Sequence, residues 1–183
     1  GSVSKTTQAQ MAMLLQEKDI RLVKLQVTAL LDKEKEEMQR CLQEVQSFLQ
    51  KNSDVLLASA ISDNDVGVAV EAGARYGLRG CEVSEKIAAS LGKIAAAAAE
   101  QPLAGMVLTG GDTAIHVCRS LGVQAIEIVE EVALGIPLGR LVGGRCPGVA
   151  VVTKAGAFGE EDSFVVSLRA LRKQSVHSTG AAD

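Results

Sequence analysis

Aromatic residues are scarce in this sequence, whose 183 residues include three Phe, one Tyr and no Trp. Proteins that bind single-stranded nucleic acid stack bases on aromatic side chains, and such platforms are missing here. The net charge of −3 at pH 7 and a pI near 5.5 also argue against a DNA-binding or anionic-membrane surface, leaving open only a local basic patch. We therefore expect an aliphatic core and no nucleic-acid partner.

Long hydrophobic runs are absent as well. The longest apolar run, residues 94–99, is short and rich in alanine, far from the roughly 18 residues of a membrane span. No signal-peptide pattern opens the sequence, so we expect a cytoplasmic protein with no membrane partner. The cysteines show neither a C-x-x-C motif nor metal-binding spacing, and we expect reduced, mostly buried thiols at Cys41, Cys81, Cys118 and Cys146.

The composition is that of a folded domain. Hydrophobic residues make up 47% and charged residues 22% of the chain, and the mean hydropathy is +0.19. These values exclude an intrinsically disordered chain, and the length fits one domain. We expect residues 1–173 to form that domain and residues 174–183, which are small and polar, to form a disordered tail.

Strand-like and helix-like segments alternate along the chain. Short apolar runs predict strands at residues 21–27, 54–61, 105–109, 125–132 and 149–153. Segments of helical periodicity predict helices at residues 6–17, 29–51, 83–101, 112–121 and 161–173. Strands joined through helices form parallel sheets by right-handed crossovers, so we expect an α/β fold with three layers, α/β/α, and a mostly parallel sheet.

Two glycine-containing loops follow predicted strands. In an open parallel sheet, ligands bind beyond the carboxyl ends of the strands, where such loops lie. The first loop precedes a helix whose free N–H groups and dipole favour an anion, and the second adds an ammonium group and accessible amides. The candidate phosphate-binding residues are Gly110, Gly111, Asp112, Thr113, Lys154, Ala155 and Gly156. Neither loop matches the known nucleotide signatures, so the prediction rests on the two loops meeting at one edge.

Other polar residues are weaker candidates. His116 follows Asp112 by one helical turn, but a partly exposed helical histidine is the simpler interpretation. Arg140 and Arg145 could touch phosphate, although loops often carry such charges for solubility. A calcium loop beginning at Asp63 is rejected, because its twelfth position, which should be Glu, is Ala74.

Three strings in this order resemble a known family: MVLTGGDTAIHVCRSLG at residues 106–122, GIPLGRLVGG at 135–144 and VVTKAGAFG at 151–159. They look like the carboxyl-terminal nucleotide-binding domain of the four-carbon acid sugar kinases, a family once labelled as Hrp-dependent type III effectors. The opening GSVSKTTQAQ is similar to the family's G-S-x-S-x-x-T-x-x-Q junction. The matching residues are Gly1, Ser2, Ser4, Thr7 and Gln10.

The resemblance implies a function beyond what the spacing of residues indicates. It implies ATP bound among Ser2, Ser4 and the two glycine loops, with Mg²⁺ bridging the phosphates. The γ-phosphoryl group would pass to the terminal hydroxyl of a C4 sugar acid: 3-oxo-tetronate, threonate or erythronate. The sugar-binding motif and the catalytic base would belong to an amino-terminal domain, so this chain alone would be inactive, and a homodimer is possible.

Two other classes of function stay open. One is a non-catalytic module that binds a nucleotide or a sugar phosphate, which includes a Hrp-dependent type III effector-like protein. The other is a purely structural α/β interaction domain, in which the glycine loops are only turns. An amino-terminal partner domain in the same reading frame would favour the kinase.

Overall fold

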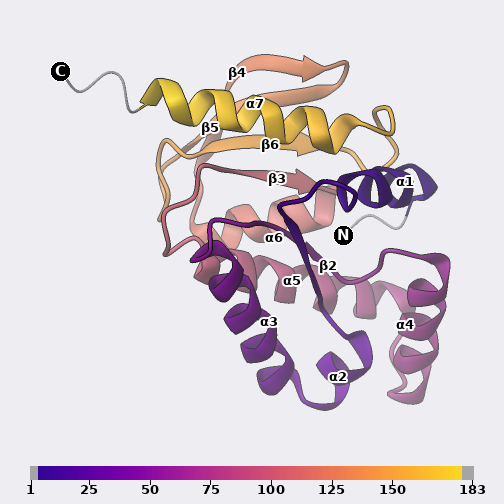
Figure 1. The fold of residues 1–183 in the computed structure, drawn as a ribbon. Helices are drawn as coiled ribbons and strands as arrows, with labels where there is room; N and C mark the ends of the chain where they lie inside the picture. Colours follow the sequence, from indigo (N-terminus) through magenta and orange to yellow (C-terminus); the bar gives the residue numbers. More distant parts are fainter. Residues whose placement is uncertain (1–3, 179–183) are drawn as a thin grey trace.

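The alternation of strands and helices predicted from the sequence is confirmed by a computed structural model, which describes residues 4–178 (Figure 1). Ser2, one of the predicted site residues, lies outside this range. The described residues form seven helices and six strands in the order α1 (Lys5–Leu14), β1 (Ile20–Lys24), α2 (Val27–Asp32), α3 (Glu34–Leu49), β2 (Asp54–Ala58), α4 (Asp63–Arg75), α5 (Gly80–Ala98), β3 (Gly105–Thr109), α6 (Gly111–Leu121), β4 (Ala125–Ala133), β5 (Ile136–Val142), β6 (Ala150–Lys154) and α7 (Ser163–Ser178).

The strands are arranged in two sheets. β1 and β2 form a parallel pair, and the other four strands are ordered β3-β6-β5-β4. β3 and β6 are parallel, with Thr109 opposite Lys154, whereas β5 runs antiparallel to both of its neighbours. The α/β class is therefore confirmed, with parallel pairing in β1–β2 and β3–β6, and the β4–β5 hairpin adds antiparallel pairs.

Helices cover both faces of the strands, which confirms the three layers (Figure 1). Side chains of β3 alternate between the two faces, as the pleat of a strand requires. Met106 and Leu108 pack with Val117 of α6 on one face. Val107 packs toward Leu171 of α7 on the other face. α1 shares the layer of α7, since both contribute to a further buried cluster.

Four segments differ from the expected elements. The helix predicted over residues 29–51 is broken at Lys33, whose φ of −137° and ψ of 63° lie outside the helical region. α4 was not predicted, because its apolar residues Val68 and Val70 are exposed and give no helical period. β5 was not predicted, because Pro137 and Gly139 interrupt its strand pattern.

The fourth difference concerns α7, which continues to Ser178 instead of ending at Lys173. Gln174 holds this turn to the hairpin, because its side chain accepts a hydrogen bond from Arg140 at 2.8 Å and donates one to Glu130 at 3.2 Å. The rest of the predicted tail, residues 179–183, lies outside the described residues.

The described helices include none that combines the length and the apolar character needed to cross a membrane. The four thiols are free, as expected. Cys41 and Cys146 are buried and Cys118 is half-buried, but Cys81 is exposed, contrary to the prediction of mostly buried thiols. Burial, and next the nearby Glu37 carboxylate, raise the pKa of Cys41 to about 12, which keeps that thiol protonated and unreactive.

Close packing of α5 against α6 fixes the helix that begins at the first glycine loop. A Cβ atom added to Gly92 would stand 2.7 Å from the carbonyl carbon and oxygen of His116. We expect Gly92→Ala to lower the free energy of unfolding by about 1–2 kcal/mol, because the overlap outweighs the better helix propensity of alanine.

Gly67→Ala in α4 is the matched control, since a Cβ there would meet no atom within 4 Å. It should raise the free energy of unfolding by about 0.5–1 kcal/mol in the same urea titration. An equal increase in the free energy of unfolding in both variants would contradict the close contact between α5 and α6.

Candidate functional site

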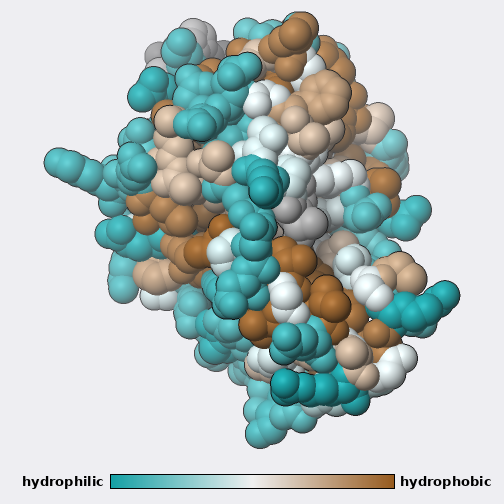
Figure 2. All heavy atoms as spheres, turned by 90° about the vertical axis from the view of Figure 1, so that its right-hand side faces the viewer, coloured by the Kyte–Doolittle hydropathy of each residue, from teal (hydrophilic) through white to brown (hydrophobic). Residues whose placement is uncertain are grey.

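The two glycine loops meet at the carboxyl ends of neighbouring parallel strands. The Gly-Gly loop (residues 110–113) follows β3, and the Lys-Gly loop (residues 154–159) follows β6. The backbone N–H of Gly110 donates to the carbonyl oxygen of Lys154 at 3.0 Å, so the loops are in direct contact. Figure 2 views the molecule from the side toward which β3 and β6 point, where hydrophobic and hydrophilic side chains are interspersed. The convergence inferred from topology is confirmed.

The Gly-Gly loop opens onto the amino end of α6. Gly110 is the N-cap residue, with a φ of 83° that favours glycine, and no side chain caps the helix. A Cβ atom on Gly111 would meet nothing within 4 Å, so a ligand has room to approach this backbone. Asp112 is exposed in the first turn and Thr113 is half-buried. The first N–H groups of a helix lack carbonyl partners within it, so this end of α6 can receive an anion.

The amino-terminal motif holds the Lys-Gly loop in place. Ser4 and Thr7 each donate a side-chain hydroxyl to the carbonyl oxygen of Gly156, both at 2.6 Å. Ser4 also caps α1 by accepting a hydrogen bond from the N–H of Thr7 at 3.1 Å, as a serine directly before a helix commonly does. Gln10 is fully buried, and its amide donates to the carbonyl oxygen of Phe158 at 3.0 Å. Residues three apart share a helix face, so α1 presents all three side chains to this loop.

Lys154 does not offer the mobile ammonium group that the sequence suggested. Its side chain is 4% exposed, and Nζ donates to the carbonyl oxygens of Ala155, Gly156 and Phe158 at 2.8, 3.2 and 2.9 Å. Nζ also lies 5.5 Å from the centre of the Phe164 ring. Burial lowers the pKa of this ammonium. The reason for the difference is that β6 turns the side chain inward, where the carbonyls of its own loop surround it.

The weaker candidates do not join the two loops. His116 Nε2 lies 3.0 Å from a carboxylate oxygen of Glu85 on α5. Arg140 donates to Gln174, and Arg145 lies 3.8 Å from the Glu100 carboxylate, beyond the carboxyl end of α5. The backbone N–H of Arg145 donates to Leu121, the last residue of α6, so this arginine is at the opposite end of that helix from Gly110.

Asp65 has a structural role that the sequence reading missed. Ser62 and Asp65 form a capping box that begins α4, and the Asp65 carboxylate forms an ion pair with Lys24 at the end of β1. Burial alone would raise the pKa of this carboxyl, but hydrogen bonds from Lys24, Ile61 and Ser62 outweigh that effect and lower it. The spacing S-x-x-D before a helix was the available signal.

The lowered pKa predicts how stability depends on pH. A carboxyl whose pKa is lower in the folded state stabilises the fold above its unfolded pKa, and this contribution is lost as the pH falls through the folded value. We expect Asp65→Asn to lower the free energy of unfolding by about 1–3 kcal/mol at pH 7. This difference in stability between the variant and the parent protein should narrow as the pH falls below 3.8, the ordinary pKa of an aspartate. Urea unfolding of both proteins between pH 7 and pH 3 measures this difference in the free energy of unfolding. A difference that did not change with pH would contradict the prediction.

Comparison with known protein families gives a match over nearly the whole chain. Residues 1–164 match a family described as nucleotide-binding C-terminal domain.

Characterised relatives are kinases. A D-threonate kinase of Bordetella bronchiseptica is 42% identical over 92 residues, which cover 50% of this chain and 23% of that enzyme. A D-erythronate kinase of Heliobacterium modesticaldum is 26% identical over 168 residues, which cover 89% of this chain and 38% of that enzyme. The chain therefore spans well under half the length of these relatives.

Solved structures share the fold. A Bordetella bronchiseptica protein, described as a domain of unknown function with bound citrate in a domain-swapped dimer, is 30% identical with a TM-score of 0.67, over 93% of this chain and 37% of that one. A Haemophilus influenzae protein gives a TM-score of 0.75 at 21% identity, over 92% of this chain and 38% of that one, and supports the fold alone.

Proposed function

Because this chain belongs to the family of nucleotide-binding C-terminal domains, we propose that it binds ATP for a four-carbon acid sugar kinase. Its relatives include enzymes named D-threonate kinase, D-erythronate kinase and 3-oxo-tetronate kinase. In the proposed reaction the γ-phosphoryl group of ATP passes to the terminal hydroxyl of such a C4 acid.

The observation that carries this proposal is the contact between the Gly-Gly loop and the Lys-Gly loop at the open end of α6. Phosphate groups need N–H donors and space, and α6 offers both where Gly111 has no neighbour within 4 Å of a Cβ position. The Ser4–Thr7–Gln10 face of α1 fixes the second loop before any ligand arrives. Phosphoryl transfer depends mainly on positioning and on charge neutralisation, so a prearranged set of amides suits it.

Mg²⁺ would arrive with the nucleotide. The described residues contain no group of three His, Cys, Asp or Glu side chains that could hold a metal ion by themselves. Bound phosphates would therefore supply most of its ligands, with Asp112 as the carboxylate nearest in sequence to the α6 amides. The ion would neutralise phosphate charge there.

The rest of the catalytic machinery is assigned to protein outside this chain. The chain covers only 23% and 38% of the two kinases described above, so the sugar-acid site and the catalytic base fall to the remaining part of such an enzyme. We propose that this domain alone binds nucleotide without turnover, and that it forms a homodimer, as the Bordetella bronchiseptica structure is described to do.

A sugar-phosphate-binding module is the second candidate, because the amides of α6 would hold any phosphate. Calorimetric titration of the chain with ATP, ADP and a four-carbon sugar phosphate, each with and without Mg²⁺, separates the two. The kinase proposal expects saturable binding of ATP and ADP that is tighter than the binding of the sugar phosphate, and a Mg²⁺ effect that Asp112→Ala removes. The reverse pattern would support the module, and the absence of binding in all titrations would leave only a structural domain.

A further inference from the structure

The Lys-Gly loop turns its carbonyl groups inward, toward the ammonium group of its own first residue. Nζ of Lys154 donates to the carbonyl oxygens of Ala155, Gly156 and Phe158 at 2.8, 3.2 and 2.9 Å. The N–H of Phe158 donates to the carbonyl oxygen of Ala155 at 3.1 Å, which closes residues 155–158 into a tight turn. The backbone of this turn therefore surrounds a buried cation.

The direction of the N–H groups in this turn follows from the planarity of the peptide bond. In a trans peptide group the C=O and the N–H of the next residue point in opposite directions. Because the carbonyls of Ala155 and Gly156 point toward the ammonium, the N–H groups of Gly156 and Ala157 point away from it. Within the part of the chain that the structure describes, no hydrogen bond uses either N–H group, and Ala157 is exposed. Successive N–H groups in a turn can form a concave site for an anion.

Three donors converge on the carbonyl oxygen of Gly156. The hydroxyl groups of Ser4 and Thr7 each lie 2.6 Å from it, and Nζ of Lys154 lies at 3.2 Å. A peptide group whose oxygen accepts hydrogen bonds donates more strongly through its own N–H, because hydrogen bonds in a chain polarise one another. The N–H of this peptide group belongs to Ala157. The three donors therefore fix the direction of that N–H and strengthen it for an anionic acceptor.

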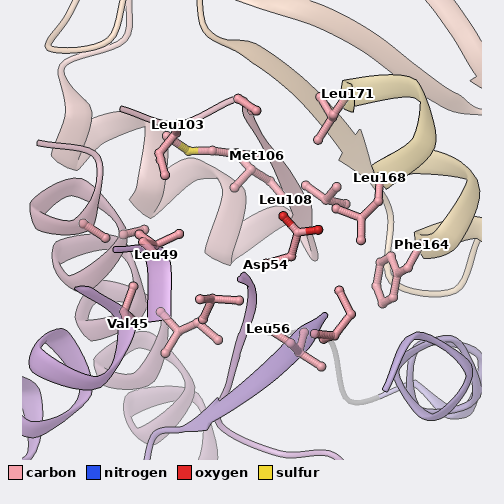
Figure 3. Close-up of a pocket in the computed structure, with 18 of the residues that line it drawn as sticks. Val45, Leu49, Asp54, Leu56, Leu103, Met106, Leu108, Phe164, Leu168 and Leu171 are labelled. Carbon is pink, nitrogen blue, oxygen red and sulfur yellow. The ribbon is translucent and has the colours of Figure 1, made fainter. Parts of the chain in front are cut away.

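The charge of Lys154 is not neutralised by a carboxylate. None of the ion pairs among the described residues includes this lysine, although its side chain is only 4% exposed. Nζ lies 5.5 Å from the centre of the Phe164 ring, and Phe164 lines a cavity between β2, β3 and α7 (Figure 3). A buried charge is less screened than one in water. An anion on the outer side of the turn is therefore attracted by this charge without touching it.

We propose that Lys154 is a positioning residue for the nucleotide, whose ammonium group holds the N–H groups of Gly156 and Ala157 outward as donors to a phosphate oxygen. The inference rests on the proposed function for the identity of the anion, the phosphate chain of a nucleotide. Since Gly110 donates to the carbonyl oxygen of Lys154 at 3.0 Å, the two loops can hold one phosphate chain between them. Backbone N–H groups then make the contact that the sequence suggested for the ammonium itself.

The test compares Lys154→Met with the parent protein, by calorimetric titration with ATP and with inorganic triphosphate, at a temperature at which circular dichroism shows both proteins to be folded. The variant should bind both ligands at least about tenfold more weakly. Backbone amide NMR of the parent protein should show that inorganic triphosphate shifts the N–H groups of Gly156 and Ala157.

The two ligands separate this inference from the proposed function. Equal affinities of the variant and the parent protein for ATP would overturn the inference and leave nucleotide binding intact. Triphosphate bound at these N–H groups, in a protein that binds ATP no more tightly, would support the inference and contradict the proposed function. If neither ligand bound the parent protein, both would be overturned.

Chemical rescue separates the ammonium from the packing of its stem. Lys154→Ala leaves space for n-propylammonium, and 1-propanol is the matched neutral compound. The ammonium should restore at least half of the lost affinity for triphosphate, 1-propanol should restore none, and neither should change the parent protein. Equal restoration by both compounds would overturn the positioning role.

Thr7→Val tests the inference without altering Lys154, in case neither lysine variant folds. It removes one of the three donors to the Gly156 carbonyl and should weaken triphosphate binding roughly 2- to 10-fold. Ser167→Ala is the matched control, because its buried hydroxyl donates to the carbonyl oxygen of Ser163 at 2.7 Å within α7. This control should bind triphosphate as the parent protein does. Equal affinities of Thr7→Val and Ser167→Ala would overturn the inference.

Discussion

Replacing Lys154 with methionine is expected to lower the free energy of unfolding by about 2–4 kcal/mol and the melting temperature by roughly 5–15 °C. Methionine keeps the length and the packing of the buried stem but carries no donor. The carbonyl oxygens of Ala155 and Phe158 would each lose the hydrogen bond that the ammonium donates at 2.8 and 2.9 Å. Buried acceptors without donors account for most of the expected loss.

Lys51→Met is the matched control, because Lys51 is exposed on the turn after α3. Its effect should stay within about 0.5 kcal/mol in the same thermal and urea titrations. If the two variants were equally stable, the hydrogen bonds of Lys154 would contribute nothing to the stability of the fold, which would contradict this account.

Gly111→Glu is expected to weaken binding of ATP roughly 10- to 100-fold, or about 1.4–2.8 kcal/mol, while leaving the fold as stable as before or more stable. A glutamate at the first residue of α6 suits the helix dipole and replaces a poor helix former, and together these effects stabilise the helix. The same carboxylate would repel phosphate at the amides of residues 111–113. Binding and stability should therefore change in opposite directions.

Gly67→Glu adds the same charge to the middle of α4, where a Cβ also meets no atom within 4 Å. This control should bind ATP as the parent protein does, when the two are compared by calorimetry at one ionic strength. A loss of affinity in Gly67→Glu as large as in Gly111→Glu would mean that net charge, rather than the Gly-Gly loop, determines binding.

The parts of the site that could be predicted from the sequence are those determined by short-range pattern. Apolar runs located β3 and β6, glycine located the loops after them, and helical periodicity located α1. Parallel topology then brought the loops together without any knowledge of distances.

Other features depend on contacts between distant residues and left no local signal. The inward direction of Lys154 depends on the carbonyls that surround it, which a strand pattern does not reveal. Ser4 and Gly156 are 152 positions apart, so the motif could be recognised but its role as an anchor could not.

Backbone amide NMR during titration with Mg²⁺ and ATP tests the central claim most directly. The account predicts that the largest chemical-shift changes fall on the N–H groups of Gly111, Asp112 and Thr113 and on those of Ala155 and Gly156. All five should follow a single saturation curve. Saturable binding that left these five amides unmoved and shifted another part of the chain would contradict it.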